Sequence, residues 1–450
     1  MATHRRRRLS AIAALLAAVL VVTTACTDEP DPAPNQGPTP VAKALTFGVF
    51  GSSGEVAAYQ SMANSFDGDV RVMAWKDADE ATRAFRSGMD LPDVFLVPRR
   101  SLGWFLDRDL TQPVDELLDE RGVNFGDDYN RDAVRAFASD GALQCMPFAV
   151  SPMVIYYNRD LIDFDRMRER DLDAPDTASK WTFSQFEEAA AFATRPRRGT
   201  RGVWIDPTIP GMAPFVLSGG GQLFDDASEP TSLAFSSEET QTALSTTLEL
   251  LRNAQVTPTD KQLAHRTPLE LFEAGKLGMI AGFRNLTPQL RQVGTLNFDV
   301  MPMPTLDSAA TIGDFVGLCM SSDSVNPSAA ADFVVHTLSE SAVSRVTRAG
   351  YLVPANVKVA ASDDFLQPGQ QPLQSQVFTD SIRNIEGMPL LDSWSRLQDA
   401  VGPSLRQLIT DPVLDLPALG EEIDSQSRTV LDPEQASPTT SPSPTDESSD

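Results

Sequence analysis

The stretch from Ala142 to Asp160 constrains the fold of this chain more than any other. An apolar segment runs up to Pro147, small residues follow, and a second apolar segment at Met153–Tyr157 ends in Asn-Arg-Asp, which predicts a helix start. Pro147 and Pro152 each lack a backbone N–H and bias the preceding residue toward extended geometry. The pattern predicts two strands joined across a bend, as in a chain that leaves one sheet and enters another.

Length and charge narrow the class of protein. A chain of 450 residues with 41% hydrophobic residues is expected to form two lobes rather than one core. The net charge of −25 argues against a nucleic-acid partner, because affinity for phosphate needs clustered Lys and Arg. The chain has only 3 histidines, which disfavours a His-rich metal site or a His-based catalytic centre.

The N-terminus has the parts of a secretory signal. Four arginines at Arg5–Arg8 precede an apolar run at Leu9–Val22, and small residues lead to Cys26. The run is shorter than the about 20 residues that a membrane span needs. Because the small residues end in Cys, residues 1–26 resemble a bacterial signal peptide with a lipobox. The resemblance implies that Cys26 becomes the N-terminus and carries diacylglyceryl and acyl chains; a plain signal peptide or an uncleaved anchor is the alternative.

Low-complexity segments flank the body of the chain. Residues 27–42 are rich in proline, acidic and polar residues, which predicts a semi-extended tether. Residues 433–450 are rich in Ser, Thr, Pro and acidic residues, which predicts a disordered, exposed tail.

Between these segments, strand patterns and helix patterns alternate without an internal repeat. This alternation predicts an α/β fold with mainly parallel sheets. Further strands are expected at Ala44–Phe50, Val70–Trp75, Asp93–Val97, Gly202–Asp206, Leu277–Ala281, Phe298–Pro302 and Phe315–Ser321. Helices are expected at Glu55–Phe66, Asp79–Arg86, Arg99–Leu106, Thr182–Thr194, Ser237–Asn253, Leu269–Glu273, Ala329–Leu338 and Leu391–Ile409.

Short motifs in a fixed order carry a family resemblance. They are Leu-Pro-Asp-Val-Phe at 91–95, Trp-Thr-Phe-Ser-Gln-Phe at 181–186, Gly-Gly-Gln-Leu-Phe at 220–224, Phe-Glu-Ala-Gly-Lys-Leu-Gly-Met at 272–279, Val-Met-Pro-Met-Pro at 300–304 and Gly-Tyr-Leu-Val-Pro-Ala at 350–355. Together with residues 142–160, they resemble landmarks of the family 1 extracellular solute-binding proteins, the maltodextrin-binding type, over residues 44–410. Each motif is weak alone, and their order makes the signal specific.

This resemblance implies a two-lobed periplasmic-binding-protein fold of type II, with hinge strands and a ligand cleft that closes between the lobes. Lobe 1 is expected at residues 43–148 plus 316–365, and lobe 2 at residues 149–315 plus 366–432. The implied function is that of a substrate-binding lipoprotein of an ABC-type importer. It would act as a monomer on the extracytoplasmic face of the cell membrane and pass its solute to the permease, without catalysis, cofactor or metal.

Cys145 and Cys319 are the cysteines that remain after Cys26. Two cysteines in an exported chain are disulfide candidates, although their spacing alone cannot pair them. The family resemblance places their strands side by side near the hinge, which implies a Cys145–Cys319 disulfide. Two buried free cysteines are the alternative.

Ligands in open α/β sheets bind beyond the carboxyl ends of the strands, and this rule selects candidate contact residues. Ser52 and Ser53 follow the first strand and offer hydroxyls and N–H groups to a ligand, or they simply cap a helix. Arg99 and Arg100 follow the third strand and offer planar donor groups, or they form a solvated pair.

Candidates on the other side of the cleft follow from the resemblance. Phe283 and Arg284 come after the strand at Leu277–Ala281, where family members carry an aromatic residue that stacks on the ligand. Asp314 and Phe315 lie at the strand that leads back into lobe 1. Asp314 could accept hydrogen bonds from ligand hydroxyls, or it caps a turn.

Trp394 lies where sugar-binding relatives of the family carry a stacking Trp, and an aromatic face suits the C–H face of a sugar. The alternative is a core position, because Trp394, Leu397 and Val401 share one helical face. The chain departs from the sugar binders in having only 5 Trp and 5 Tyr, and in lacking an aromatic residue at 208–212. A sugar or a related polyol is therefore the default ligand of the family rather than one these residues indicate.

Other functions stay open. One is a lipoprotein that senses a ligand for a membrane receptor, and another is a binder of a non-sugar solute such as a glycerophosphodiester. A third is an exported hydrolase, although enzyme functions in general are disfavoured, because the chain lacks a P-loop, a Gly-x-Ser-x-Gly elbow and a calcium-binding loop.

Overall fold

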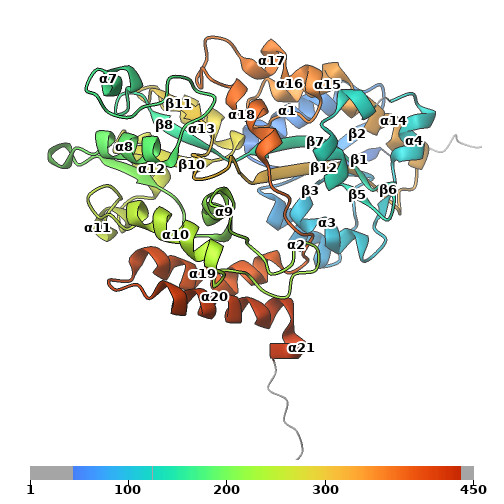
Figure 1. The fold of residues 1–450 in the computed structure, drawn as a ribbon. Coiled ribbons are helices and arrows are strands. Elements are labelled where there is room, and N and C mark those ends of the chain that lie inside the picture. The colour runs from blue at the N-terminus through green and yellow to red at the C-terminus, as the bar shows by residue number, and fades with distance from the viewer. Residues whose placement is uncertain (1–43, 124, 437–450) are drawn as a thin grey trace, which may run out of the picture. The chain divides into compact units, whose positions relative to one another are not determined.

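The computed structural model describes residues 44–123 and 125–436, which are arranged around two β-sheets (Figure 1). The expected signal peptide with Cys26, the tether at 27–42 and residues 437–450 of the expected tail lie outside the described residues. Disorder from residue 433 is wrong at its start, because Pro433–Ala436 form a short helix. Within the described ranges, none of the helices has the length and hydropathy that a membrane crossing requires.

The first sheet has six strands in the order β2-β1-β3-β12-β4, with β7 also paired to β12. β1 is parallel to β2 and to β3, whereas β12 is antiparallel to β3, β4 and β7. These strands are β1 Leu45–Phe50, β2 Val70–Trp75, β3 Val94–Pro98, β4 Thr111–Gln112, β7 Cys145–Pro152 and β12 Gly313–Ser321. A separate hairpin pairs β5 Ala138–Ser139 with β6 Ala142–Leu143.

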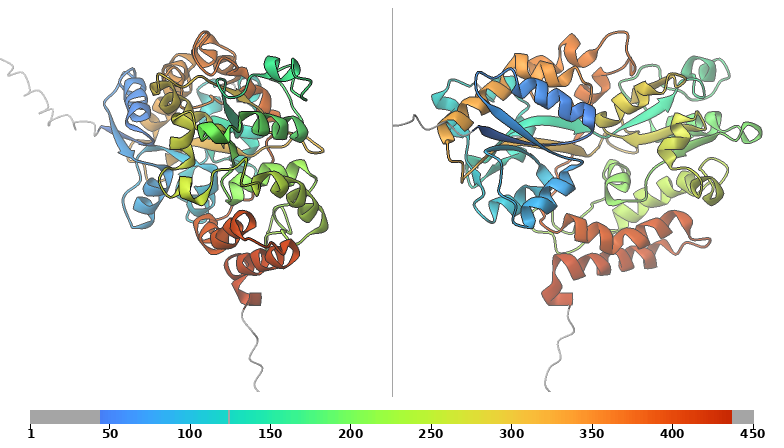
Figure 2. Two further views of the ribbon diagram at one scale, coloured as in Figure 1. Left: turned by 90° about the vertical axis from the view of Figure 1, so that its left-hand side faces the viewer. Right: turned by 180° about the vertical axis from the view of Figure 1, so that it is seen from behind.

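Helices cover both faces of the first sheet, as the right-hand view of Figure 2 shows. They are α1 Ser53–Ala63, α2 Ala78–Arg86, α3 Arg99–Leu106, α4 Asp115–Glu120, α5 Phe125–Asp128, α6 Arg131–Ala136, α14 Pro327–Leu338, α15 Glu340–Thr347 and α16 Val357–Ala360. Phe47, Phe95 and Phe333 are fully buried within this core, which the apolar faces of the strands and helices share.

The second sheet has four strands in the order β11-β8-β10-β9. They are β8 Val154–Asn158, β9 Arg201–Trp204, β10 Leu277–Gly282 and β11 Phe298–Met301. β8 is antiparallel to both of its neighbours, and only β9 and β10 are parallel. Both sheets are therefore mixed, because β12 and β8 each run opposite to the other strands of their sheet. The remaining strands of each sheet share one direction, so the expectation of mainly parallel sheets is confirmed except at these two strands.

Two cores lie against the second sheet. One includes Trp181, Phe186 and Phe215, and the other includes Tyr156 and Phe298. The helices in this part of the chain are α7 Phe164–Arg168, α8 Phe183–Ala193, η1 Pro196–Arg198, α9 Ile209–Ser218, α10 Glu238–Leu251, α11 Asp260–Leu263, α12 Pro268–Glu273, η2 Arg284–Leu286, α13 Thr287–Gln292, α17 Asp363–Leu366, α18 Gln376–Ser381, η3 Ile382–Asn384, α19 Trp394–Thr410, α20 Leu416–Leu431 and α21 Pro433–Ala436.

All of the strands and helices expected from the alternating pattern are present, with ends within three residues of the prediction. The prediction that a helix starts at Asn158 is wrong. Asn158 ends β8, and its side chain accepts a hydrogen bond from the N–H of Asp160 in a turn (2.9 Å). The next helix, α7, is capped by Asp163 instead, since an Asn side chain can close a local turn without starting a helix.

The two strands expected at the bend are confirmed. β7 belongs to the first sheet and β8 to the second, so the chain crosses between the sheets at Met153. The N–H of Met153 donates to the carbonyl of Ile312, and the hydroxyl of Thr311 donates to the carbonyl of Met153. The outgoing and returning chains therefore cross side by side, a few residues from the expected lobe limits at 148 and 316.

Cys145 and Cys319 lie directly opposite each other on β7 and β12 and form a disulfide, with their Cα atoms 4.4 Å apart. This separation is within the usual range for disulfides. The pairing implied by the family resemblance is thus present in the structure, and the alternative of two free cysteines is not.

Candidate functional site

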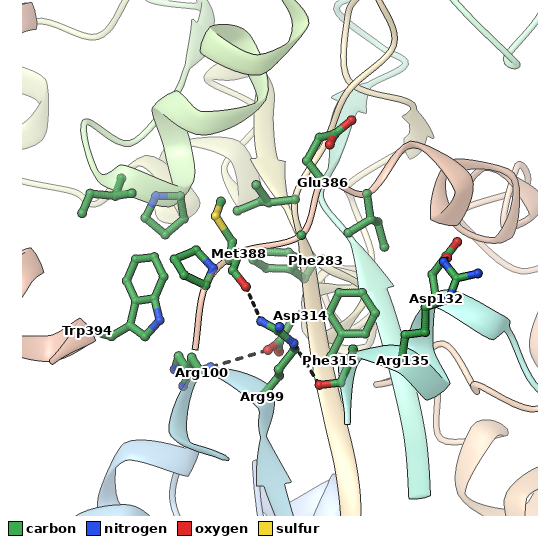
Figure 3. Close-up of a pocket in the computed structure, with 18 of the residues that line it drawn as sticks. Arg99, Arg100, Asp132, Arg135, Phe283, Asp314, Phe315, Glu386, Met388 and Trp394 are labelled. Atoms are coloured by element: carbon green, nitrogen blue, oxygen red, sulfur yellow. Dashed lines mark hydrogen bonds and ion pairs between the residues drawn. The ribbon is translucent and has the colours of Figure 1, made fainter. Parts of the chain in front are cut away.

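A cavity of about 560 Å³ draws its lining from elements of both sheets (Figure 3). We call it the apolar chamber. Its apolar lining consists of Ala136, Ile209, Pro210, Phe283, Ile312, Phe315, Ile385, Met388, Pro389 and Trp394. Its charged lining consists of Asp79, Arg99, Arg100, Asp132, Arg135, Asp314 and Glu386.

A second cavity of about 540 Å³ adjoins the first, because both are lined by Arg100, Phe283 and Asp314. We call it the polar chamber. Its polar lining includes Ser52, Ser53, Glu55, Lys76, Asp77, Ser151, Asn285, Gln289, Gln292 and Tyr351. Several of these residues directly follow β1, β2 and β3, so the chamber lies beyond the carboxyl ends of three parallel strands.

The turn between β1 and α1 forms one wall of the polar chamber. The side chain of Ser52 caps α1 by accepting a hydrogen bond from the N–H of Glu55 (3.4 Å). A Cβ atom on Gly51 would lie 2.2 Å from a carboxylate oxygen of Glu55, and one on Gly54 would lie 2.4 Å from the hydroxyl of Tyr351. The two glycines therefore allow an acid and a phenol to lie against the start of α1.

The electrostatic environment of Glu55 is unusual. Burial of its carboxyl group and the nearby charge of Asp314 raise the pKa of Glu55 to about 7, and a hydrogen bond from the backbone of Ser52 acts in the opposite direction. At neutral pH this group therefore exists in both protonation states. It can accept a hydrogen bond from a ligand or donate one.

Arg100 and Asp314 stand at the boundary between the chambers. The guanidinium of Arg100 pairs with Asp79 at 3.1 Å and with Asp314 at 3.5 Å. Phe283 lies beside this pair in both cavities. The boundary thus combines an aromatic ring with charged groups that both donate and accept hydrogen bonds, and these side chains are partly exposed to the cavities.

Arg99 has a different role from its neighbour. Its Nε donates to the carbonyl of Ala136 (3.0 Å), and its Nη1 donates to the carbonyl of Met388, as Figure 3 shows. Burial lowers the pKa of Arg99. Arg99 therefore holds the segment at 385–389, one wall of the apolar chamber, against helices of the first sheet.

Most of the residues predicted to contact the ligand line the two chambers. They are Ser52, Ser53, Arg99, Arg100, Phe283, Asp314, Phe315 and Trp394. The structure brings them together from five separate parts of the chain, and their contact with a ligand stays a prediction.

Arg284 is the exception, and its expected position in the cleft is wrong. Its side chain is fully buried and donates hydrogen bonds to the carbonyls of Gly350 (3.2 Å) and Phe365 (3.4 Å) and to the hydroxyl of Ser375 (3.2 Å). The backbone at Phe283 is extended, so adjacent side chains point to opposite sides. Phe283 consequently faces the chambers while Arg284 points into the core.

Trp394 lies both against the core and at the apolar chamber, and its stacking on a ligand stays a prediction. Its ring meets Phe224 edge to face, with ring centroids 5.8 Å apart, and this contact belongs to the core. The same side chain lines the apolar chamber, and its Nε1 is buried without a hydrogen-bond partner among the described residues.

Sequence reasoning missed Glu55, Tyr351 and the segment at 385–389. Glu55 has the sequence signature of an ordinary acid in the first turn of a helix, and Tyr351 lies in one of the family motifs without any sign of its direction. Ile385 and Met388 lie in a stretch with no strand or helix pattern. Only their position in the folded protein, beside segments that are distant in the sequence, identifies these residues as part of the site.

The sequence model of the bacterial extracellular solute-binding protein family matches residues 56–370. This match covers more than two thirds of the chain, so the protein belongs to that family. The two sheets, the crossing strands and the cavity between their elements agree with the two-lobed periplasmic-binding-protein fold.

Solved structures support the same fold. The ABC substrate-binding protein Lmo0181 from Listeria monocytogenes, solved with cycloalternan, is 20% identical, has a TM-score of 0.71, and covers 86% of this chain and 98% of its own. UgpB from Mycobacterium tuberculosis, solved with glycerophosphocholine, is 17% identical and has a TM-score of 0.70. The match covers 87% of this chain and 99% of UgpB. The maltotriose-binding protein of Thermus thermophilus is 16% identical and has a TM-score of 0.66. The match covers 86% of this chain and 100% of that protein.

Among curated proteins, none has a sequence that matches this chain. Within the described residues, no group of three or more His, Cys, Asp or Glu side chains is arranged to hold a metal ion.

Proposed function

We propose that this protein is the substrate-binding lipoprotein of an ABC-type importer and that it captures a sugar or a related polyol. The adjoining chambers carry this proposal. They present the rings of Phe283 and Trp394 beside the charged pair of Arg100 and Asp314. A sugar offers apolar C–H faces to aromatic rings and hydroxyls to charged donors and acceptors, so it satisfies both kinds of lining.

The mechanism is capture, closure and delivery without covalent chemistry. Chambers of about 560 and 540 Å³ are each within the range of about 300–1,000 Å³ for small-molecule sites. The ligand contacts elements of both sheets at once, so it binds the closed arrangement more tightly and shifts the protein toward it. The strands that cross at Met153 and Ile312 serve as the hinge.

The proposed location of the protein in the cell rests on the sequence of the N-terminal segment, which lies outside the described residues. Lipid modification of Cys26 anchors the monomer on the extracytoplasmic face of the cell membrane, and residues 27–42 connect the anchor to the body. The permease receives the ligand there. The neighbours in fold that were solved with cycloalternan and with maltotriose support the choice of a carbohydrate.

Thermal unfolding of the full-length protein in neutral detergent, with a panel of sugars and polyols, tests the proposal. A ligand at a hundred times its dissociation constant stabilises the folded state by about 2.7 kcal/mol. We expect a shift with one sugar class, and we expect Asp314→Asn to lose most of it. Asp332→Asn is the matched control, because Asp332 pairs with Arg121 and lines neither chamber. If no sugar or polyol shifts the transition, the ligand class is wrong.

A glycerophosphodiester is the second candidate, and the polar chamber favours it. The chamber contains the N-terminal end of α1 and Lys76, whose ammonium forms no ion pair in the described part of the chain. UgpB, a neighbour in fold, was solved with glycerophosphocholine. A shift with this compound that Lys76→Gln abolishes, with no shift from sugars, would favour this candidate.

Binding alone does not separate import from sensing. Ligand-dependent stimulation of ATP hydrolysis by a co-reconstituted permease is expected for the import role. A ligand-bound protein that leaves the hydrolysis rate unchanged would instead indicate that it reports to a receptor.

A further inference from the structure

We propose that a cluster of five arginines beside α7 and η1 is a second binding site, for a small anion that carries phosphate groups. The cluster surrounds a hollow of about 540 Å³ that is separate in its lining from both chambers. We call it the arginine hollow. It is lined by Arg166, Arg170, Phe192, Arg195, Pro196, Arg197 and Arg198. α7 and α8, beside which it lies, are at the left of the ribbon in Figure 1.

None of the five arginines forms an ion pair with a carboxylate in the described ranges. Arg168, on the same short helix but outside the hollow, does pair with Asp165. The chain carries 62 acidic residues and a net charge of −25, so unpaired arginines gathered at one place are not a consequence of composition. The cluster of five arginines therefore has a local positive charge that a bound anion would neutralise.

The positive charges in the hollow act on one another. Burial lowers the pKa of Arg195, and the charges of Arg198, Arg166 and Arg170 lower it further. Like charges held this close oppose folding in the absence of a counter-ion. An anion with several oxygens relieves this repulsion at several guanidinium groups at once.

The backbone that carries these side chains is fixed by hydrogen bonds. The buried hydroxyl of Thr200 donates to the carbonyl of Ala193 (2.8 Å) and accepts from the N–H of Arg195 (3.0 Å). Gly199 turns the chain after η1 with a φ of 68°, which glycine adopts readily. The loop therefore presents Arg197 and Arg198 from a constrained turn, which lowers the entropy that binding would otherwise cost.

The side chains suit phosphate in particular. A guanidinium donates two parallel hydrogen bonds to the oxygens of one phosphate group. Arg170 lies over the ring of Phe192, with 5.5 Å from its Cζ to the ring centroid, which restrains that guanidinium at the edge of the hollow. Arg195 is held by a hydrogen bond from its Nη2 to the carbonyl of Leu161 (3.3 Å). Two of the five arginine side chains are thus held in position before an anion binds.

A discrete anion fits this site better than an extended anionic surface. Charges interact in solution over a Debye length of about 8 Å at physiological ionic strength, so the hollow attracts an anion locally. An acidic body of net charge −25 is repelled by a broad anionic membrane or by nucleic acid. The phosphate group could belong to a soluble compound or to the headgroup of a single lipid molecule.

The test is calorimetric titration of full-length protein in neutral detergent with pyrophosphate, at about 150 mM ionic strength. We expect one saturable site, and at least about tenfold weaker binding by Arg166→Gln/Arg197→Gln/Arg198→Gln. Arg345→Gln/Arg396→Gln/Arg406→Gln is the matched control, because it also removes three positive charges, from exposed residues that make no ion pair within the described residues. The control is expected to bind pyrophosphate like the unmodified protein.

Folding is checked by the thermal transition of each variant, and Arg197→Gln/Arg198→Gln replaces the triple variant if that one unfolds. The source of the phosphate is separated by competition with monomeric dihexanoyl phosphatidylglycerol. Displacement of pyrophosphate by this lipid, but not by dihexanoyl phosphatidylcholine, identifies a lipid headgroup. Failure of the lipid to compete identifies a soluble phosphate compound.

Three results would overturn the proposal. One is the absence of pyrophosphate binding at millimolar concentration. Another is equal weakening in the hollow variant and in the control, which would show that only the overall charge matters. The third is saturable binding of a poly-aspartate peptide without binding of pyrophosphate, which would make the hollow a protein-docking surface instead.

Discussion

Phe283 and Arg284 show how neighbouring residues divide between function and stability. Phe283 lines both chambers, whereas the guanidinium of Arg284 satisfies two carbonyls and a hydroxyl inside the core and lies over the rings of Phe365 and Phe378. Burial lowers the pKa of Arg284 to about 10, so the group still carries its charge at neutral pH. The charge is tolerated because several acceptors surround it.

Replacement of Arg284 by Ala is expected to destabilise the protein by about 3–5 kcal/mol, since it leaves buried acceptors unpaired and opens a cavity. Chemical denaturation measures the loss. Arg396→Ala, at an exposed position on α19, is expected to change the free energy of unfolding by no more than about 0.5 kcal/mol. Equal effects of the two changes would contradict the structural role of Arg284.

Glu55 predicts a pH dependence of stability. Its pKa rises from 4.5 to about 7 on folding, so the folded state holds the proton more tightly than the unfolded state between these values. The contribution of Glu55 to stability is therefore greatest below pH 4.5 and is lost as the pH rises toward 7.

The variant Glu55→Gln imitates the protonated form at every pH. We expect it to be more stable than the unmodified protein above pH 7, by about 1–3 kcal/mol, and we expect the difference to shrink toward pH 4.5. Thermal unfolding across this range measures the effect. Glu421→Gln, exposed on α20, is the control, and a difference that does not vary with pH would contradict the shifted pKa of Glu55.

At the scale of elements, β7 and β12 join the two sheets. They pair from Gly313 with Pro152 to Cys319 with Cys145, and the disulfide links them at the end away from the crossing. The cross-link therefore fixes the pair of strands that leads into the hinge. It closes a loop between cysteines separated by 174 residues.

Removal of the disulfide by Cys145→Ser/Cys319→Ser is expected to lower the free energy of unfolding by about 2–5 kcal/mol, because the unfolded chain regains the freedom of this loop. The denaturant midpoint measures the loss. Reducing agent should lower the midpoint of the unmodified protein and leave that of the double variant unchanged. An unaltered midpoint in both experiments would contradict a stabilising disulfide.

At the scale of the whole molecule, elements from both sheets meet around the chambers. Arg99 of α3 donates to the carbonyl of Met388, and Arg86 of α2 pairs with Asp392, so the segment before α19 is tied to helices of the first sheet. The first contact is half-buried and the second lies near solvent, whereas β7 and β8 are fully buried. Motion about the hinge is therefore expected to break the former and keep the latter.

Binding of a ligand is expected to make the protein more compact. Small-angle X-ray scattering of the full-length protein in detergent should give a smaller radius of gyration when the ligand found in the thermal screen is saturating. Asp314→Asn is the control for ligand-dependent change, because it is expected to lose most of the binding of the ligand. An unchanged radius at saturation would contradict the closure mechanism, while leaving binding itself intact.

The sequence by itself determined the elements and the family. Thr182 and Gln185 form the capping box that starts α8, and the prolines at 147 and 152 mark the crossing of the chain between sheets. These features depend on residues a few positions apart, so they can be read locally. The ordered motifs indicated the fold and the family, and together with the rule for strand ends they predicted eight of the residues that line the chambers.

Only the tertiary structure decided which side chains face which space. The inward direction of Arg284, the position of Glu55 beside Asp314, and the gathering of Arg166 with Arg197 all depend on packing between distant segments. Local patterns contain no record of that packing, because an arginine after a strand has the same sequence signature whether it points into the core or into a cavity. The physical difference lies in the partners that the rest of the chain provides for each charge.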